Sequence, residues 1–165
     1  MELYIIRHGI ASEPGTAGMS DEERPLTAEG VRKMRLAAAG FRHLDIVPPL
    51  ILSSPLVRAY QTAEILADEF GKGTRLEIAP ELSPGGSRTK VFQEIAVRQD
   101  LERLMLVGHQ PSLGEIAGEI AFGSAGCCLE LKKGGGCGLR LLRLRPAPRG
   151  TLLWLLPPSI LRATK

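Results

Sequence analysis

Two histidines stand directly after short apolar segments, in positions where a pair of imidazoles could do chemistry together. His8 follows the run that starts at Leu3, and His109 follows a second run that starts at Leu104. In open α/β sheets, ligands bind at the carboxyl ends of neighbouring strands, so two strands could bring these rings face to face. An unperturbed histidine is largely neutral at pH 7 and is a nucleophile that needs no metal.

Arginines accompany the two histidines. Arg7 precedes His8, and a third apolar segment, Leu50–Ser53, leads into a helix whose first turn contains Arg58. A guanidinium group binds phosphate oxygens through paired hydrogen bonds, and a helix N-terminus also favours an anion. Phosphoryl transfer requires positioning and charge neutralisation more than covalent chemistry. Two histidines and two arginines around one phosphate therefore suffice for double displacement through a phosphohistidine, with no metal and no cofactor.

The elements that must position these residues follow from the alternation of apolar strands and amphipathic helices up to Phe122. Strands are expected at 3–6, 50–53, 75–78 and 104–107, and helices at 27–44, 56–70, 87–99 and 112–122, the first with Thr27 as its N-cap. Beyond Phe122 the pattern predicts an antiparallel meander with strands at 128–131, 139–145 and 151–156. We therefore expect an α/β fold, a three-layer sandwich with a mostly parallel central sheet and an antiparallel C-terminal portion.

Length and composition predict one domain over residues 1–165. Hydrophobic residues make up 44% and charged residues 24% of the chain, which is typical of a globular protein. No apolar run approaches the ~20 residues of a membrane span, and the N-terminus has no signal-peptide pattern. The net charge of +3 gives no indication of nucleic-acid binding. We expect a cytoplasmic monomer that binds neither nucleic acid nor a membrane.

Other residues that could carry chemistry have simpler interpretations. His43 is expected to end a helix without a special role. Three cysteines, Cys127, Cys128 and Cys137, lack a fourth ligand at zinc-site spacing and are expected to be reduced thiols. From Lys132 to the C-terminus there are eight basic residues and no acidic one. This stretch is either a solvated sheet edge, where basic side chains discourage edge pairing, or a docking surface for an acidic partner.

Several of these residues stand in motifs that resemble the histidine phosphatase superfamily, the phosphoglycerate-mutase-like phosphatases. The RHG sequence at Arg7–Gly9 is similar to the first motif, Ser53–Ala63 to the second and Val107–His109 to the third. The resemblance is closest to the small SixA-type phosphohistidine phosphatases, through the segments Arg24–Thr27, Pro80–Pro84 and Pro157–Ser159. It spans nearly the whole chain, and the motifs occur in the family's order.

The resemblance implies a role for each matching residue. It implies that His8 is the nucleophile and that Arg7 and Arg58 bind phosphate. His109 is implied to contact the phosphate and to stabilise the transferring group. Arg24 is implied to add a further phosphate ligand from the loop.

The general acid is a separate question. Many phosphatases of the superfamily place a Glu or Asp between the second and third motifs, and Glu81 lies in that interval. Glu81 is therefore a candidate general acid, with a structural position beside Pro80 as the alternative. An alkoxide leaving group needs a proton, and a positioned acid contributes ~10²–10⁴-fold. Imidazole leaves more readily, so a site without an acid suits phosphohistidine better than sugar phosphates.

The function that the resemblance implies is dephosphorylation of a phosphohistidine-bearing protein domain through a phosphohistidine enzyme intermediate. A small-molecule phosphomonoesterase of the same superfamily is the first alternative, and a catalytically silent phosphate-binding module is the second. The chain is short, which leaves little sequence for insertions that would roof a pocket over a metabolite. A complete set of histidines and arginines argues against a silent module, because binding alone needs no nucleophile.

Overall fold

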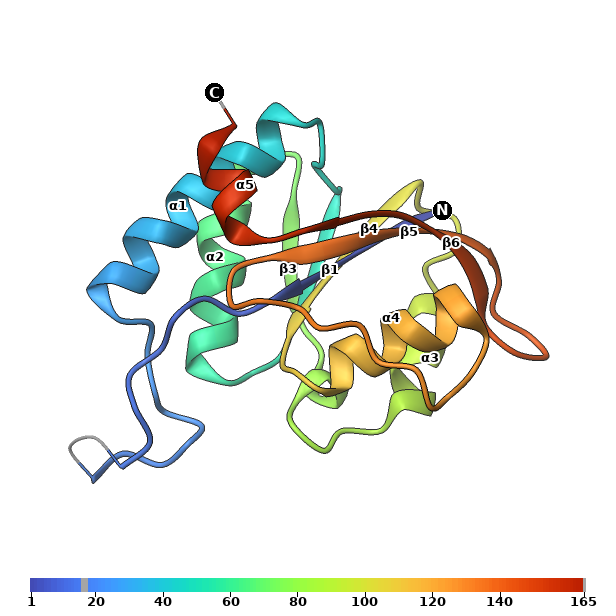
Figure 1. Ribbon diagram of the computed structural model, residues 1–165, viewed down its shortest axis with the longest axis horizontal. Coiled ribbons are helices and arrows are strands. Elements are labelled where there is room, and N and C mark those ends of the chain that lie inside the picture. Colours follow the sequence, from blue (N-terminus) through green and yellow to red (C-terminus); the bar gives the residue numbers. More distant parts are fainter. Residues whose placement is uncertain (16–17, 165) are drawn as a thin grey trace.

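The computed structural model describes residues 1–15 and 18–164, and within them a six-stranded sheet lies between two layers of helices (Figure 1). The strand order is β3-β2-β4-β1-β5-β6. The first four strands are parallel and the last two antiparallel: β1 (Glu2–Arg7), β2 (Leu50–Ser53), β3 (Arg75–Ile78), β4 (Arg103–Gly108), β5 (Gly136–Arg143) and β6 (Arg149–Leu156). The predicted three-layer α/β sandwich is confirmed.

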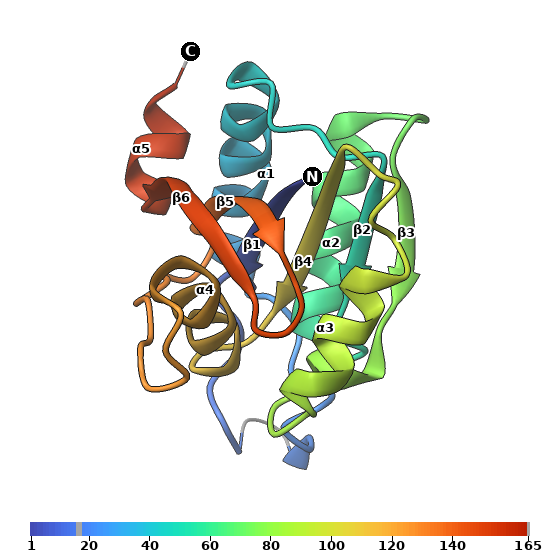
Figure 2. The ribbon, with the colours of Figure 1, turned by 90° about the vertical axis from the view of Figure 1, so that its right-hand side faces the viewer.

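Helices cover both faces of this sheet (Figure 2). One layer consists of α1 (Ala28–His43), α2 (Val57–Phe70) and α5 (Pro158–Ala163), and the other of α3 (Arg88–Ala96) and α4 (Ser112–Phe122). A 3₁₀ turn, η2 (Pro80–Leu82), lies between β3 and α3. The predicted N-cap of α1 is present, since the Gly30 amide donates to Thr27 Oγ1 at 2.9 Å.

The core consists of two apolar clusters, one on each face of the sheet. Along β1, Leu3 and Ile5 pack in the cluster under α3 and α4. Tyr4 and Ile6 point the other way and pack in the cluster under α1, α2 and α5. Because both faces of β1, β2 and β4 are buried, these strands have continuous apolar sequences, which is why their positions could be predicted.

The strand predicted at 128–131 is wrong, because this segment is irregular. It lies across α4 instead of pairing with a strand, and the Leu129 amide donates to the Gly114 carbonyl at 2.9 Å. The contact is close enough that a Cβ on Gly114 would overlap the Leu129 carbonyl oxygen, and one on Gly118 would overlap that of Cys127. Two glycines on one face of a helix therefore determine the path of this segment.

The C-terminal helix α5 was not predicted, and it packs where α1 presents a glycine. Leu161 of α5 is fully buried, and a Cβ on Gly40 would overlap the Leu161 carbonyl oxygen. Two smaller differences concern element ends. The helix predicted at 87–99 ends at Ala96, and the strand predicted at 139–145 is β5, which begins at Gly136 and ends at Arg143.

The basic stretch lies largely at one edge of the sheet. Four of its arginines belong to the hairpin formed by β5 and β6, the last strand in the sheet order: Arg140, Arg143, Arg145 and Arg149. Lys165, the last residue of the stretch, lies outside the described residues, as do positions 16–17 of the loop before Arg24. In the described ranges no helix is both long enough and apolar enough to cross a membrane.

Replacing Gly40 with alanine tests the close contact between α1 and α5. At an exposed helical position this change stabilises a protein by about 1 kcal/mol, because alanine has the higher helix propensity. Here we expect the opposite sign, a loss of about 1–3 kcal/mol in the free energy of unfolding, because the added methyl would overlap the Leu161 carbonyl. Urea unfolding measures the change. The control Ala39→Gly, at an exposed neighbour, should cost about 1 kcal/mol. A stabilised Gly40→Ala protein would contradict this packing.

Candidate active site

The carboxyl ends of β1, β4 and β2 meet at one edge of the sheet and bring the two histidines together. β1 and β4 are neighbours in parallel register, with Arg7 opposite Gly108, so His8 and His109 follow at the same height. The His8 amide donates to the Gly108 carbonyl at 3.0 Å. The two imidazole centroids lie 5.1 Å apart with their planes inclined by 55°, and both rings are buried.

A hydrogen bond determines which nitrogen of His8 carries the proton. Nδ1 lies 2.7 Å from the Gly9 carbonyl oxygen, which can only accept, so Nδ1 is protonated and Nε2 carries the lone pair. The Gly9 amide is itself held, because it donates to Thr62 Oγ1 at 3.0 Å. The Thr62 hydroxyl donates to the Arg58 carbonyl at 2.7 Å, which connects the first motif to α2. This tautomer is the one that a nucleophilic imidazole requires.

Burial keeps both imidazoles neutral. It lowers the pKa of His8 to about 3, and the nearby charges of Arg58 and Arg7 act in the same direction. It lowers the pKa of His109 to about 4, again with a contribution from Arg58. Both pKa values lie far below that of a solvated histidine, about 6.5. Positive charge in this site therefore comes from the arginines and from Lys133, and not from the histidines.

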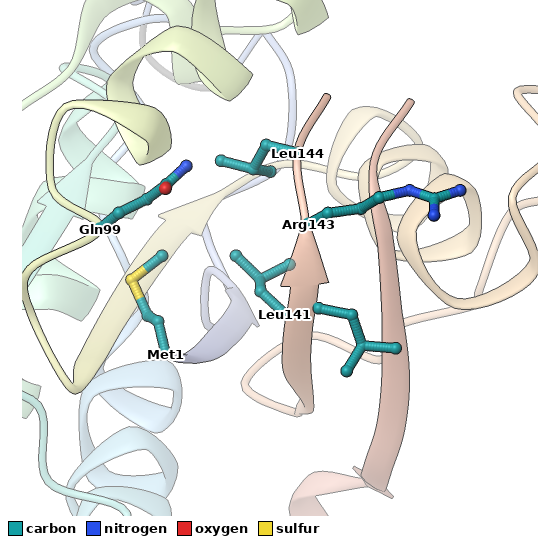
Figure 3. A pocket seen from close by; sticks show the side chains of 6 residues that line it. Met1, Gln99, Leu141, Arg143 and Leu144 are labelled. Atoms are coloured by element: carbon teal, nitrogen blue, oxygen red, sulfur yellow. The ribbon is translucent and has the colours of Figure 1, made fainter. Parts of the chain in front are cut away.

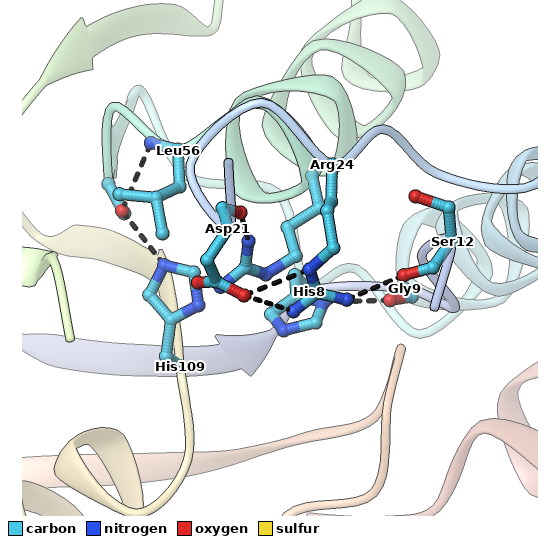
Figure 4. Close-up of polar contacts among 9 residues, drawn as sticks. His8, Gly9, Ser12, Asp21, Arg24, Leu56 and His109 are labelled. Carbon is cyan, nitrogen blue, oxygen red and sulfur yellow. Dashed lines mark hydrogen bonds and ion pairs between the residues drawn. The ribbon is translucent and has the colours of Figure 1, made fainter. Parts of the chain in front are cut away.

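His109 is oriented by a serine at the end of β2. Its Nε2 lies within hydrogen-bond distance of Ser54 Oγ, at 2.9 Å, and the Leu56 amide donates to that fully buried hydroxyl at 3.3 Å (Figure 4). Among the described residues, the buried Nδ1 of His109 has no hydrogen-bond partner. Ser54 lies inside the second motif, Ser53–Ala63, but its contact with His109 was not predicted.

Arg7 and Arg58 lie beside the histidines. Arg7 Nη1 donates to the Leu131 carbonyl at 2.8 Å, in the irregular segment before β5. Arg58, in the first turn of α2, is only 3% exposed. Within the described part of the chain, neither buried Nε has a hydrogen-bond partner. Buried donors are normally satisfied, so an oxyanion that accepts from them would be stabilised.

A carboxylate that was not among the predicted site residues bridges two of the arginines. Asp21 Oδ1 accepts from Arg24 Nε at 2.9 Å and from Nη2 at 2.6 Å, and Oδ2 accepts from Arg58 Nη2 at 2.9 Å (Figure 4). Arg24 Nη1 donates to the Ser12 carbonyl at 2.6 Å. The available signal was the spacing of Asp21 three residues before Arg24, which is typical of a local ion pair.

These side chains line one cavity of about 430 Å³. It brings together five of the six predicted site residues, and its lining comprises Arg7, His8, Ala11, Ser12, Glu13, Pro14, Asp21, Arg24, Arg58, Pro84, His109, Gln110 and Lys133. Glu81 is not among them. It lies on η2 and lines a separate pocket with residues of α3 and α4. The geometry favours the structural interpretation of Glu81 over that of a general acid.

Other parts of the molecule that could have formed a site lack the side chains for phosphoryl transfer or for holding a metal ion. A smaller hollow of about 190 Å³ lies at the opposite edge of the sheet, and its side chains are apolar apart from Gln99 and Arg143 (Figure 3). Over residues 1–15 and 18–164, no three His, Cys, Asp or Glu side chains are grouped so as to hold a metal ion. The cysteines are unpaired thiols, with Cys128 exposed and Cys137 buried.

Comparisons with known proteins agree with this fold and site. Residues 3–86 match the family model of the histidine phosphatase superfamily (branch 1). An uncharacterised protein of Picosynechococcus is 43% identical over 155 residues, which is 85% of each chain. The phosphohistidine phosphatase SixA of Escherichia coli is 26% identical over 167 residues, covering 100% of this chain and 99% of SixA.

The solved structure of the protein histidine phosphatase SixA with tungstate is also similar, with a TM-score of 0.82 and 26% identity over 96% of this chain and 98% of that one. Together with the paired histidines, these similarities define an α/β phosphatase. The chain belongs to the histidine phosphatase superfamily, and the resemblance predicted from its motifs is confirmed.

The depressed pKa values give a testable result in solution. The Cε1 proton resonances of His8 and His109, assigned with the variants His8→Asn and His109→Asn, should show no titration between pH 7.5 and about 5.5 in phosphate-free buffer. Below about pH 6.5 His8 and His109 bind protons in the unfolded chain but stay neutral in the native state. The free energy of unfolding should therefore fall as the pH drops from 6.5 toward 4. A His8 midpoint near 6.5 would contradict the burial argument.

Proposed function

We propose that this protein is a phosphohistidine phosphatase that acts on a phosphorylated protein domain, with residues 1–165 working as one domain and without a metal. The observation that carries the proposal is the unprotonated Nε2 of His8, facing His109 in a cavity lined by three arginines. Similarity to SixA over the full chain supports the same substrate class.

In the first step of the proposed mechanism, His8 Nε2 attacks phosphorus and the bond from phosphorus to the substrate imidazole nitrogen breaks. The leaving nitrogen keeps the bonding electron pair, and a proton on the other nitrogen of the substrate ring makes the leaving group a neutral imidazole. Arg7, Arg58 and Arg24 donate to the non-bridging oxygens, where charge must be neutralised in the transition state. His109, oriented by Ser54, contacts the transferring phosphoryl group from the other side of the cavity.

In the second step, water attacks the phosphorylated His8 and releases orthophosphate, and His8 recovers its lone pair. Both steps break a bond between phosphorus and an imidazole nitrogen, so the leaving group is the same in the substrate and in the enzyme intermediate. The Gly9 carbonyl keeps the Nδ1 proton in place through both steps, so the same nitrogen acts each time.

The placement of Glu81 and Asp21 supports phosphohistidine as the substrate. Glu81, the candidate acid, lies outside the cavity. Hydrogen bonds from Arg24 and Arg58 lower the pKa of the Asp21 carboxyl, so it is ionised at neutral pH and has no proton to donate. Phosphate esters need that proton for an alkoxide leaving group, whereas a phosphohistidine that is protonated on its other ring nitrogen releases a neutral imidazole without a proton from the enzyme.

Replacing His8 with asparagine should abolish turnover while the fold is retained. We expect phosphate release to fall by at least about 10³-fold, because the nucleophile is lost. Brief exposure of the parent protein to a ³²P-labelled phosphohistidine substrate should give an acid-labile label on His8, located by mass spectrometry. His43→Asn, at the end of α1, is the matched control and should keep parental turnover. Near-parental turnover by His8→Asn would refute the mechanism.

The substrate class is tested by comparing kcat/KM for a phosphohistidine domain with values for a panel of phosphorylated metabolites. We expect the protein substrate to be favoured by at least ~10²-fold, about 2.7 kcal/mol of differential stabilisation, because its surface adds contacts beyond the phosphate. Equal or better turnover of a metabolite would identify a small-molecule phosphomonoesterase. Oxyanion binding without turnover of any substrate would identify a silent binding module.

A further inference from the structure

Asp21 pairs with two arginines that the proposed function assigns to phosphate. One carboxylate oxygen accepts from Arg24 and the other from Arg58, at 2.6–2.9 Å. The Asp21 side chain is 57% exposed at the mouth of the cavity, whereas that of Arg58 is 4% exposed below it. The exposed Asp21 carboxylate therefore forms an ion pair with the buried guanidinium of Arg58.

The physical reason for this pair is the burial of Arg58. A buried guanidinium without a counter-charge is strongly unfavourable, and Asp21 supplies that charge. Phosphate presents oxygen atoms to guanidinium groups in the same paired geometry as a carboxylate. Asp21 therefore uses donor groups on Arg24 and Arg58 that a phosphoryl group would also use.

We propose that Asp21 is an internal counter-ion that competes with phosphate for Arg24 and Arg58 and so weakens the binding of orthophosphate. This inference rests on the proposed function, since it assumes that both arginines bind phosphate. Among the described residues Arg58 Nε is free to bind phosphate, but a phosphate that also takes Nη2 of Arg24 and of Arg58 replaces contacts already made to Asp21, so part of the intrinsic affinity is lost. Tight binding of the product would not accelerate the reaction, and a competing carboxylate favours its release.

A positioning role for Asp21 predicts the opposite sign. If Asp21 served only to orient Arg24 and Arg58 for the ligand, its removal would weaken phosphate binding. If Asp21 competes, its removal strengthens phosphate binding. The sign of the change in affinity therefore separates the two roles, and neither measurement requires turnover.

The test is isothermal titration of the full-length protein with inorganic phosphate and with tungstate. Asp21→Asn keeps the size of the side chain and removes its charge, and we expect its dissociation constant for phosphate to fall about tenfold. Glu22→Gln is the matched control, because it removes the same charge one residue away. The structure assigns no contact to the Glu22 side chain within the described residues, and the backbone carbonyl that accepts from Val57 is kept. Its affinity should stay within about twofold of the parent's.

Asp21→Ser is a second neutral variant and should tighten binding in the same direction, while Asp21→Glu retains the charge and should not. Unchanged or weaker phosphate binding in both neutral variants would overturn the inference. Arg58→Ala separates this result from the proposed function. If Arg58→Ala binds phosphate as tightly as the parent does, the assignment of the phosphate site is wrong. If Arg58→Ala binds at least tenfold more weakly and the Asp21 variants bind no tighter, only the counter-ion role is wrong.

Discussion

The parallel register between β1 and β4 is the constraint on which the site depends. It sets Arg7 opposite Gly108, so the next residue of each strand is a histidine at the same edge of the sheet. A shift of one residue would turn every side chain of β1 to the other face, so that Tyr4 and Ile6 would have to fit into the cluster that now holds Leu3 and Ile5. Packing in the hydrophobic core therefore fixes the register of β1, and this register places the ring centroids of His8 and His109 5.1 Å apart.

Burial at this edge of the sheet leaves the histidines neutral and the arginines charged, so the two kinds of side chain have different roles. Histidines removed from water become harder to protonate, which leaves a lone pair on His8 Nε2 for attack on phosphorus. Arginine keeps its charge in surroundings where histidine loses it, so the arginines supply the positive potential for phosphate. The burial of Arg58 in turn requires an anion when no substrate is bound, and the loop before α1 provides Asp21.

Much of the fold was predictable because its signals are local. Apolar runs without alternation indicated parallel strands buried on both faces, and Thr27 indicated where α1 begins. The irregular segment at 128–131 and the short helix α5 were not predictable in this way. Each is positioned by a close approach to a glycine of a distant helix, Gly114 in α4 and Gly40 in α1. From the sequence alone, a glycine in a helix indicates only a lower helix propensity, and the segment that packs against it is not specified.

For the site, the sequence by itself determined the residue types and their order along the strands, and with them the expectation that His8, His109 and Arg58 meet at one edge. Only the tertiary structure decided the tautomer of His8, the neutrality of both rings and the pairing of Asp21 with two arginines. It also placed Glu81, inside the predicted interval, on the wall of a different pocket. These properties depend on burial and on distances between segments far apart in the chain, which no local pattern specifies.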